Sequence, residues 1–197
     1  NPDPVKLEEL NARLRATCLV RRTKDQVLTE LPAKQRADVW LTIDNRAAYD
    51  RAERGAVKGL GDAAEHLTRI GTLRQLAAEG KLEAIKAWVT DFLESGEKLV
   101  IFAQHIATQQ ALIAAFPGCA AVLGEMDAQT RQDNVDAFQK DAAVKLIVCS
   151  LKAAREGITL TAASNVAFAE LGWHPGEMLQ AEDRCHRIGQ TDAVTAW

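Results

Sequence analysis

The feature that most constrains this chain is a series of short apolar runs that alternate with helical segments from Lys98 onward. Short apolar runs bounded by polar residues are typical of strands buried on both faces of a sheet. Strands that alternate with helices predict an α/β fold, a parallel sheet with helices on both faces. We expect strands at residues 98–103, 120–123, 144–150, 165–169 and in the closing run 191–197, and helices at 106–116, 127–139 and around Gln180.

The loops that follow these strands have a predictable position. Ligands of a parallel α/β sheet bind beyond the carboxyl ends of its strands. Three loops leave those ends, at residues 104–105, 150–157 and 170–176. We expect them to gather along one edge of the sheet, together with the start of the helix that carries Gln180.

The first part of the chain is predicted to be mainly helical. We therefore expect a helical extension and a segment that leads into the sheet at residues 1–96, and the sheet domain itself at residues 97–197. The elements expected before the sheet are helices at residues 5–18 and 45–78, the latter interrupted near Gly59 and Gly61, a strand at 37–43, and a third helix from Lys81 to Leu93 after Gly80.

A tight basic cluster of Arg21, Arg22 and Lys24 lies ahead of Pro32. It could contact a phosphate backbone or an acidic neighbouring domain, or it could be an ordinary basic surface turn. The sequence leaves these alternatives open.

Composition limits the classes of function. The formal charge of −3 and pI of about 5.9 argue mildly against a purely electrostatic nucleic-acid binder, but a local basic patch is compatible with them. No apolar run has the length of a membrane span, and from the opening residues we expect no signal peptide. The chain starts at Asn1 without a methionine and stops in a strand-like run, so we expect a piece of a longer polypeptide.

The cysteines are scattered and form no C-x-x-C pair, a pattern that fits reduced thiols in an intracellular protein. Cys149 lies in an apolar run and is predicted to be a core residue. Cys185 and His186 are adjacent, but no second ligand pair accompanies them, so a zinc site is disfavoured and no metal site is expected.

The stretch QAEDRCHRIGQ, residues 180–190, offers the strongest chemistry. If it is helical, Gln180, Arg184 and Arg187 lie at i, i+4 and i+7 on one stripe. Guanidinium groups bind phosphate oxygens bidentately and stay charged at any working pH. We expect this stripe to project from the carboxyl edge of the sheet.

A plainer interpretation of the same stretch is a solvated surface helix. Asp183 with Arg187, and Glu182 with His186, would then be ordinary ion pairs one helical turn apart.

The stretch SLKAAREGITLT, residues 150–161, is a candidate cradle for an anion. A hydroxyl at a strand end, Lys152, and the pair Glu156 and Gly157 leave backbone amides near a strand-to-helix turn. An ordinary turn fits the same residues. Gly157 would then be present only because glycine adopts backbone conformations that other residues avoid. Arg131 on another helix is either a further anion contact or a surface charge.

Five blocks of the sequence, in this order, resemble the second ATPase lobe of the Swi/Snf-type DNA translocases of helicase superfamily two. They are LVRRTKDQVLTELPAK, KLVIFAQH, GEMDAQTRQDNVDAF, SLKAAREGITLTAAS and FAELGWHPGEMLQAEDRCHRIGQ, and the resemblance extends from Cys18 to Trp197. The last block is the most specific, and its lead-in FAELGWHPG is most similar to the annealing-helicase branch.

This resemblance implies a RecA-like lobe entered through a helical extension. It also implies ATP with Mg, bound between this lobe and a first RecA-like lobe of the same polypeptide that holds most of the nucleotide. The implied partner is double-stranded or forked DNA, with no membrane, and the implied location is the bacterial cytoplasm and nucleoid or the nucleus.

The resemblance also assigns roles to individual residues. Arg184 and Arg187 match the two arginines of motif six, which would reach the γ-phosphate as arginine fingers, and Gln180 would help to position them as part of the catalytic set. Glu156 and Gly157 match motif five, which joins nucleotide to DNA, so the ATP-binding set is Glu156, Gly157, Arg184 and Arg187. Trp173 matches an aromatic between motifs five and six. Contacts to DNA are implied for Gln104, His105, Ser150, Lys152, Arg155, Arg21 and Arg22.

The sequence departs from the pattern of the family at several places. Ala154 and Arg155 stand where many relatives have two glycines, and His174 replaces a common asparagine. No phosphate-binding loop of the form G-x-x-x-x-G-K-S/T occurs, and no acidic magnesium-binding box is evident, so we expect the chain alone to be inactive. Two alternatives remain, an RNA helicase lobe and a non-catalytic nucleic-acid or protein docking module.

Overall fold

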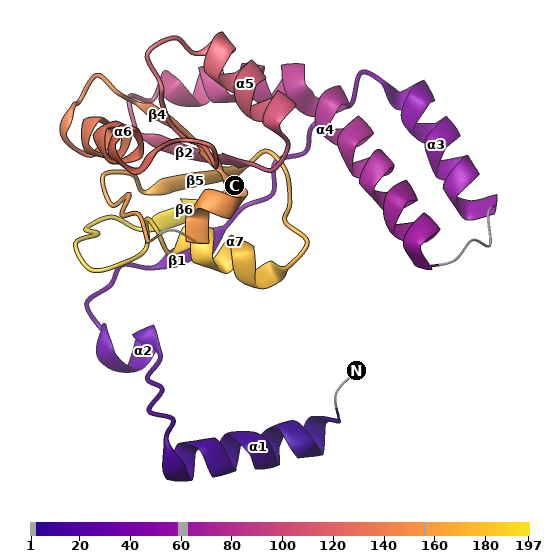
Figure 1. The fold of residues 1–197 in the computed structure, drawn as a ribbon. Helices are drawn as coiled ribbons and strands as arrows, with labels where there is room; N and C mark the ends of the chain where they lie inside the picture. The colour runs from indigo at the N-terminus through magenta and orange to yellow at the C-terminus, as the bar shows by residue number, and fades with distance from the viewer. Residues whose placement is uncertain (1–2, 59–62, 156) are drawn as a thin grey trace. The chain divides into compact units, whose positions relative to one another are not determined.

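A six-stranded sheet, parallel at every strand pair, organises the second of two compact units in the computed structural model (Figure 1). The units are Asn1–Leu31 and Pro32–Trp197. The structure describes residues 3–58, 63–155 and 157–197, except for the side chains at positions 25, 56–58, 63, 64, 154 and 155. None of the helices among these residues is long and apolar enough to cross a membrane.

The strand order is β1-β6-β5-β2-β4-β3, so the chain crosses the sheet repeatedly instead of pairing neighbours in sequence. The register places Leu99 opposite both Leu146 and Asn165, which puts β2 at the centre between β4 and β5. The strands are β1 (Lys34–Arg36), β2 (Leu99–Ala103), β3 (Ala120–Val122), β4 (Leu146–Ser150), β5 (Asn165–Phe168) and β6 (Val194–Ala196).

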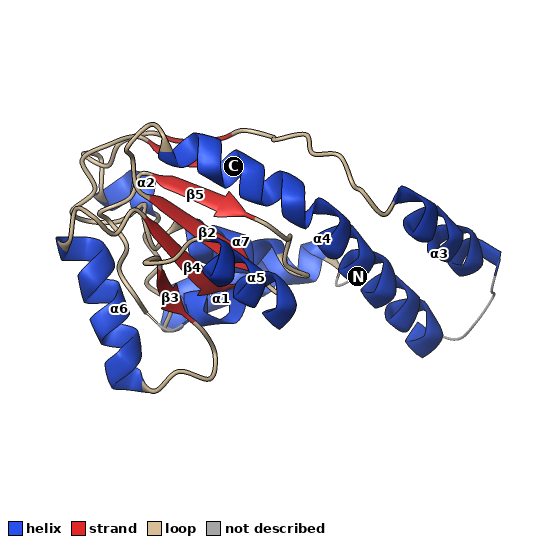
Figure 2. Ribbon diagram, turned by 90° about the horizontal axis from the view of Figure 1, so that it is seen from above, coloured by secondary structure: helices blue, strands red, loops and turns tan. Residues whose placement is uncertain are grey.

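Helices cover both faces of the sheet (Figure 2), as the sequence predicts. Alternate residues of β2 point to opposite faces: Val100 and Phe102 to one core, Leu99 and Ile101 to the other. The helices are α1 (Pro4–Thr17) and α2 (Lys24–Val27) in the first unit, then α3 (Arg46–Lys58), α4 (Ala63–Leu93), α5 (Ile106–Ala115), α6 (Ala128–Lys140), the 3₁₀ helix η1 (Leu151–Arg155) and α7 (Pro175–Glu182).

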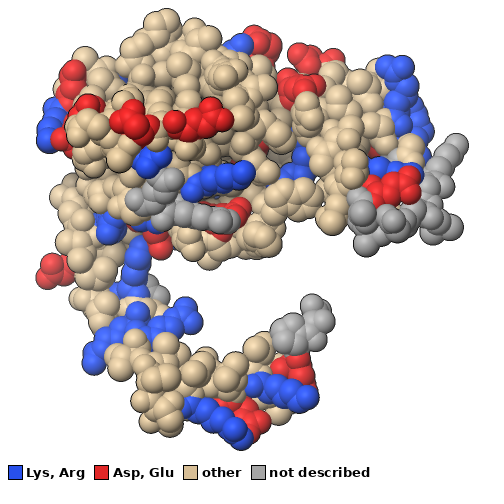
Figure 3. Space-filling view, viewed as in Figure 1, with Lys and Arg blue, Asp and Glu red and all other residues tan. Residues whose placement is uncertain are grey.

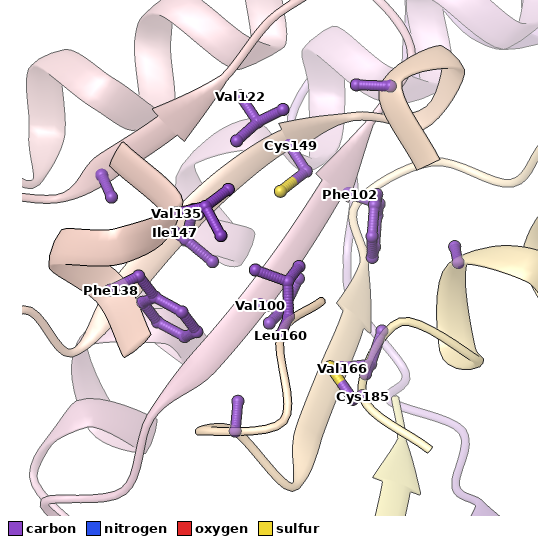
Figure 4. Packing of buried hydrophobic residues seen from close by; sticks show 14 of the residues in the cluster. Val100, Phe102, Val122, Val135, Phe138, Ile147, Cys149, Leu160, Val166 and Cys185 are labelled. Atoms are coloured by element: carbon purple, nitrogen blue, oxygen red, sulfur yellow. The ribbon is translucent and has the colours of Figure 1, made fainter. Parts of the chain in front are cut away.

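The first core joins one face of the sheet to α6, η1, α7 and the loop after α7 (Figure 4). Val135 and Phe138 of α6 enter it, as their helical spacing predicts, and Phe138 is fully buried. Asp127 caps α6, because its carboxylate accepts a hydrogen bond from Thr130 N at 2.9 Å. The predicted core position of Cys149 is also confirmed.

The strand expected at residues 37–43 lies three residues earlier, at Lys34–Arg36. Its partner β6 has only three residues, so the ladder ends once Ala37 N donates to Ala196 O. Leu41 then packs against the second core, while Trp40 points to solvent with 92% of its surface exposed.

The helix expected to begin at Lys81 is instead the second half of α4, which runs without a break through Gly80. Gly80 allows residues 44 and 45 to lie close against α4. Its carbonyl accepts from Asp44 N at 3.0 Å, and the Asn45 amide lies where a Cβ would stand. The Asn45 amide also donates to Leu76 O at 2.8 Å. The interruption expected near Gly59 and Gly61 lies outside the described residues.

The boundary between the two compact units lies between residues 31 and 32 of the chain, whereas the expected position is between 96 and 97. The reason is that β1 is a strand of the sheet, and α4 contributes Ile85 and Val89 to its second core.

Two glycines of α4 give opposite predictions. Gly80→Ala should lower the free energy of unfolding by about 1–3 kcal/mol, because the new Cβ displaces Asn45 and breaks its hydrogen bond to the helix. Gly71→Ala, with nothing within 4 Å of its Cβ position, should raise it by up to about 1 kcal/mol. Urea unfolding of the chain measures both, and equal effects of the two substitutions would contradict this account of Gly80.

Candidate functional site

Two of the loops expected to meet at the carboxyl edge of the sheet do so through His105 and Glu170. These residues follow the neighbouring strands β2 and β5. The Glu170 carboxylate, only 6% exposed, accepts from His105 N at 3.1 Å and lies 2.5 Å from His105 Nδ1. This pair fixes the loop after β2 to the loop after β5.

Arg74 of α4 ties the same two loops together and was not anticipated from the sequence. Its Nη2 donates to Gln104 Oε1 at 3.0 Å and also to the carbonyl of Leu171. Its guanidinium carbon lies 4.2 Å from the centre of the Trp173 ring, in reach of a cation–π contact. The surrounding Ala-rich helix carries no motif, so only the folded structure identifies this arginine.

The third loop, after β4, joins this edge through η1. Ser150 ends β4 and is buried, whereas Lys152 is exposed on η1. A methyl group at Gly172 would collide with the Leu151 side chain, so η1 lies against the loop after β5. The structure thus brings Gln104, His105, Ser150 and Lys152 to one edge.

The candidate anion cradle is only partly described. The side chain of Arg155 and all of Glu156 lie outside the described residues. Gly157 has φ of +74°, a left-handed conformation that suits glycine, so its backbone freedom is used here. The guanidinium of Arg131 donates to Met126 O at 2.9 Å, beside the first turn of its own helix.

The prediction that Gln180, Arg184 and Arg187 share one helical stripe is wrong. Gln180 is exposed on the last turn of α7, but that helix ends at Glu182, and both arginines lie in the loop that follows. We call residues 183–193 the arginine loop. In this loop the Arg184 carbonyl accepts from Leu160 N at 2.9 Å, and Gly189 has φ of +98°, outside the helical range.

The arginine loop also lies elsewhere than predicted. It leads into β6, so it belongs to the side of the sheet where strands begin, away from the connection between β5 and α7 (Figure 1). Arg187 Nη1 donates to Thr159 Oγ1 at 3.0 Å, in the segment that precedes β5. The arginines therefore do not project from the carboxyl edge.

The two guanidinium groups are close enough to affect each other. Burial and the nearby positive charge of Arg187 lower the pKa of Arg184, although the group stays protonated at neutral pH. Both side chains are partly exposed. Two cations held near each other at a surface favour an anion with several oxygens, such as a phosphate.

Glu182 has other partners than the ion pair expected of a surface helix. Glu182 is 1% exposed and pairs with Lys34 and Arg36 of β1, each at 2.8 Å. His186 bonds through Nε2 to Pro32 O at 2.8 Å. Glu182 is thus buried beneath two cations of β1 and does not lie on a solvated helix face.

The basic cluster near the start of the chain belongs to the first unit. Arg21 and Arg22 are exposed, and Figure 3 shows basic side chains gathered around α2. Their surface exposure is compatible with binding a polyanion.

Cys149 and Cys185 are buried, whereas Cys18 is exposed. Burial raises the pKa of Cys149 and Cys185 far above that of a reactive thiol. Within residues 3–58, 63–155 and 157–197, no three His, Cys, Asp or Glu side chains are grouped to hold a metal ion.

An apolar hollow of about 420 Å³ lies beside the carboxyl ends of β1, β5 and β6. Trp40, Trp88, Leu171 and Trp197 line it, with Lys81 and Asp38 as its charged members. This lining does not resemble a phosphate site, which needs several cations or amides.

Residues 80–189 match the family described as helicase conserved C-terminal domain. The SWI/SNF-related matrix-associated actin-dependent regulator of chromatin subfamily A-like protein 1 of Drosophila melanogaster is 37% identical over 95% of this chain and 26% of its own length. The human DNA annealing helicase and endonuclease ZRANB3 is 33% identical over 95% of this chain and 18% of its own length. The chain therefore spans about a quarter or less of these relatives.

Solved structures agree with the fold. The C-terminal part of the Fun30 ATPase domain superposes with a TM-score of 0.70 over 84% of each chain, at 17% identity. The Sulfolobus solfataricus SWI2/SNF2 ATPase core in complex with dsDNA gives a TM-score of 0.65 at 25% identity, over 99% of this chain and 47% of the other. The parallel sheet thus matches the C-terminal lobe of such ATPases.

Arg74→Ala should loosen the loop after β5. Loss of the bonds to Gln104 and Leu171 removes about 1 kcal/mol or more, so amide exchange at residues 171–174 should rise roughly fivefold or more. Hydrogen-exchange mass spectrometry measures this rise. Lys86→Ala, which removes an i,i+3 pair with Glu83 on the same helix, is the control and should leave these amides unchanged.

Proposed function

The chain belongs to the helicase conserved C-terminal domain family, in its SWI/SNF branch, and from that premise we propose that it is the second motor lobe of an ATP-dependent translocase on double-stranded DNA. The observation that carries the proposal is the pair Arg184 and Arg187, held close together on a loop that is bonded to its neighbours on both sides. The lobe acts with a first RecA-like lobe of the same polypeptide.

The proposed role of the two arginines is that of arginine fingers. Transfer of the γ-phosphoryl group spreads negative charge over its oxygens, and guanidinium groups stabilise that charge. The partly exposed arginines fit the terminal phosphate of MgATP, whereas the chain lacks a phosphate-binding loop for the rest of the nucleotide. We assign that part, and the Mg ion, to the first lobe, and keep Gln180 in the proposal as an exposed amide on the last turn of α7.

The proposed DNA surface is the carboxyl edge of the sheet. Lys152 is exposed there, and Arg74 and Glu170 hold Gln104 and His105 at the end of the neighbouring strand β2. Ser150 and Arg155 lie within three residues of Lys152 in the sequence, and Arg21 and Arg22 are proposed separately as DNA contacts of the first unit. Lysine and arginine contacts to phosphates give affinity without sequence preference, as a translocase requires.

A short segment links the two proposed sites. Residues 152–159 run from the exposed Lys152 to Thr159, the hydroxyl that Arg187 binds. A backbone movement at Lys152 could therefore be transmitted along residues 152–159 to Arg187. This supports the proposed role of Glu156 and Gly157 in joining DNA binding to the nucleotide.

The chain by itself should not hydrolyse ATP, because it supplies arginines but no phosphate-binding loop. Phosphate release by the purified chain, with and without duplex DNA, measures this. DNA-stimulated turnover by the chain would contradict the assignment. In the full-length protein, stimulation by RNA instead of duplex DNA would favour an RNA helicase lobe, and no turnover at all would favour a docking module.

Arg187→Ala and Lys152→Ala in the full-length protein should have reciprocal effects. Arg187→Ala should lower kcat at least about 100-fold and leave the Kd for duplex DNA within about twofold, because a finger acts on the transition state. Lys152→Ala should weaken DNA binding and reduce the slope of log K against log salt by about one, with kcat at saturating DNA little changed.

Steady-state ATPase assays and DNA binding across salt concentrations measure this pair. Loss of DNA affinity in Arg187→Ala with normal turnover would reassign that residue to the DNA surface.

A further inference from the structure

Glu182 is the most deeply buried charged side chain of the structure's described residues, and it is held by the strand that leads into the lobe. Its carboxylate is 1% exposed and accepts from Arg36 Nε at 2.8 Å and Arg36 Nη2 at 3.1 Å, while Lys34 Nζ lies at 2.8 Å. Lys34 and Arg36 are two residues apart on β1, so they present both cations to the same side.

This carboxylate is charged in the folded protein. Burial on its own would raise the pKa of Glu182, but the bonds from Arg36 and Lys34 and their charges outweigh burial, and the pKa lies below its ordinary value. A buried carboxylate with two cationic partners is strongly destabilised by loss of its partners.

The same residue begins the arginine loop. The Glu182 carbonyl accepts from Cys185 N at 3.1 Å and from His186 N at 3.0 Å. His186 then donates through Nε2 to Pro32 O at 2.8 Å, and Lys34 Nζ lies 3.5 Å from Asp183 Oδ1. Glu182 at the end of α7, and Asp183 and His186 in the first half of the loop, are therefore each bonded to residues 32–36.

The other side of the loop is fastened to the segment before β5. Leu160 N donates to the Arg184 carbonyl at 2.9 Å. The buried amide of Gln190 donates to Cys185 O at 3.2 Å and Ala163 O at 2.8 Å. Arg184 and Arg187 thus sit on a loop held between two supports, and the support on the β1 side depends on Glu182.

We propose that Glu182 is a positioning residue for the two arginines, and that through it strand β1 sets where the arginine loop stands. The catalytic half of this proposal rests on the proposed function of the lobe. Glu182 touches no nucleotide; it acts through the loop it anchors.

The anchoring of the arginine loop by Glu182 predicts that movement of β1 affects the two arginines. A three-residue edge strand such as β1, paired only with β6, is weakly held by its ladder alone. Residues 32–36 directly continue the first unit, which carries Arg21 and Arg22. A load on that unit that shifts β1 would therefore move Glu182 and the arginines with it.

The test uses Glu182→Gln in the full-length protein, which keeps the shape and removes the charge. Hydrogen-exchange mass spectrometry should show at least about fivefold faster exchange at residues 184–192. The kcat for ATP should fall about 10- to 100-fold, because misplacing a catalytic group by about 1 Å costs that much, while KM and DNA Kd stay within about twofold.

Two further variants keep the test decisive. Arg36→Gln removes one cation but leaves Lys34 on Glu182, so it should fold and show the same changes in smaller degree, even if Glu182→Gln unfolds. Arg36→Lys keeps the charge and should restore most of the kcat. Arg46→Gln, which breaks an exposed Nε–carboxylate pair with Asp50 at the same 2.8 Å, is the matched control and should change nothing.

If a folded Glu182→Gln protein shows the same amide exchange rates at residues 184–192 as the wild type, Glu182 does not anchor the arginine loop. Faster exchange with an unchanged kcat would overturn the positioning role and leave a purely structural one. If the wild-type protein shows no ATP turnover, the proposed function of the lobe fails, while the exchange measurement still decides whether Glu182 anchors the loop.

Discussion

The parallel arrangement of all six strands is the constraint on which the rest of this structure depends. Because each strand runs the same way, every connection must return across a face of the sheet. Loops that leave strands then collect at one edge, and segments that lead into strands collect at the other. The chain uses both: His105, Lys152 and Glu170 lie at the first, and the arginine loop belongs to the second.

This separation suits a motor lobe with two partners. A surface that follows DNA phosphates and a loop that reaches a nucleotide need different positions, yet they must affect each other. Residues 152–159 connect them along the chain, and the bond from Arg187 to Thr159 closes the connection in space. On the opposite side of the loop, Glu182 adds a second connection, to β1. In the proposed function, the arginine loop is thus connected both to the DNA edge and to β1.

The apolar runs were sufficient to predict the central strands and the parallel sheet, because burial on both faces leaves a clear pattern in sequence. They also predicted that the loops before α5 and α7 would meet. The end of α7 could not be predicted, since it depends on Leu160 capturing the Arg184 carbonyl and on Glu182 facing Lys34 and Arg36. Arg74 and the uninterrupted passage of α4 through Gly80 depend likewise on contacts between residues distant in sequence, which a local pattern does not contain.

The most direct test is a structure of the full-length protein with duplex DNA and ADP plus aluminium fluoride, which mimics the phosphoryl group in transfer. A guanidinium of Arg184 or Arg187 should lie at hydrogen-bonding distance, about 3 Å, from the fluoride group across the gap between two lobes. Both arginines facing solvent or DNA, with another residue on the fluoride, would contradict the account.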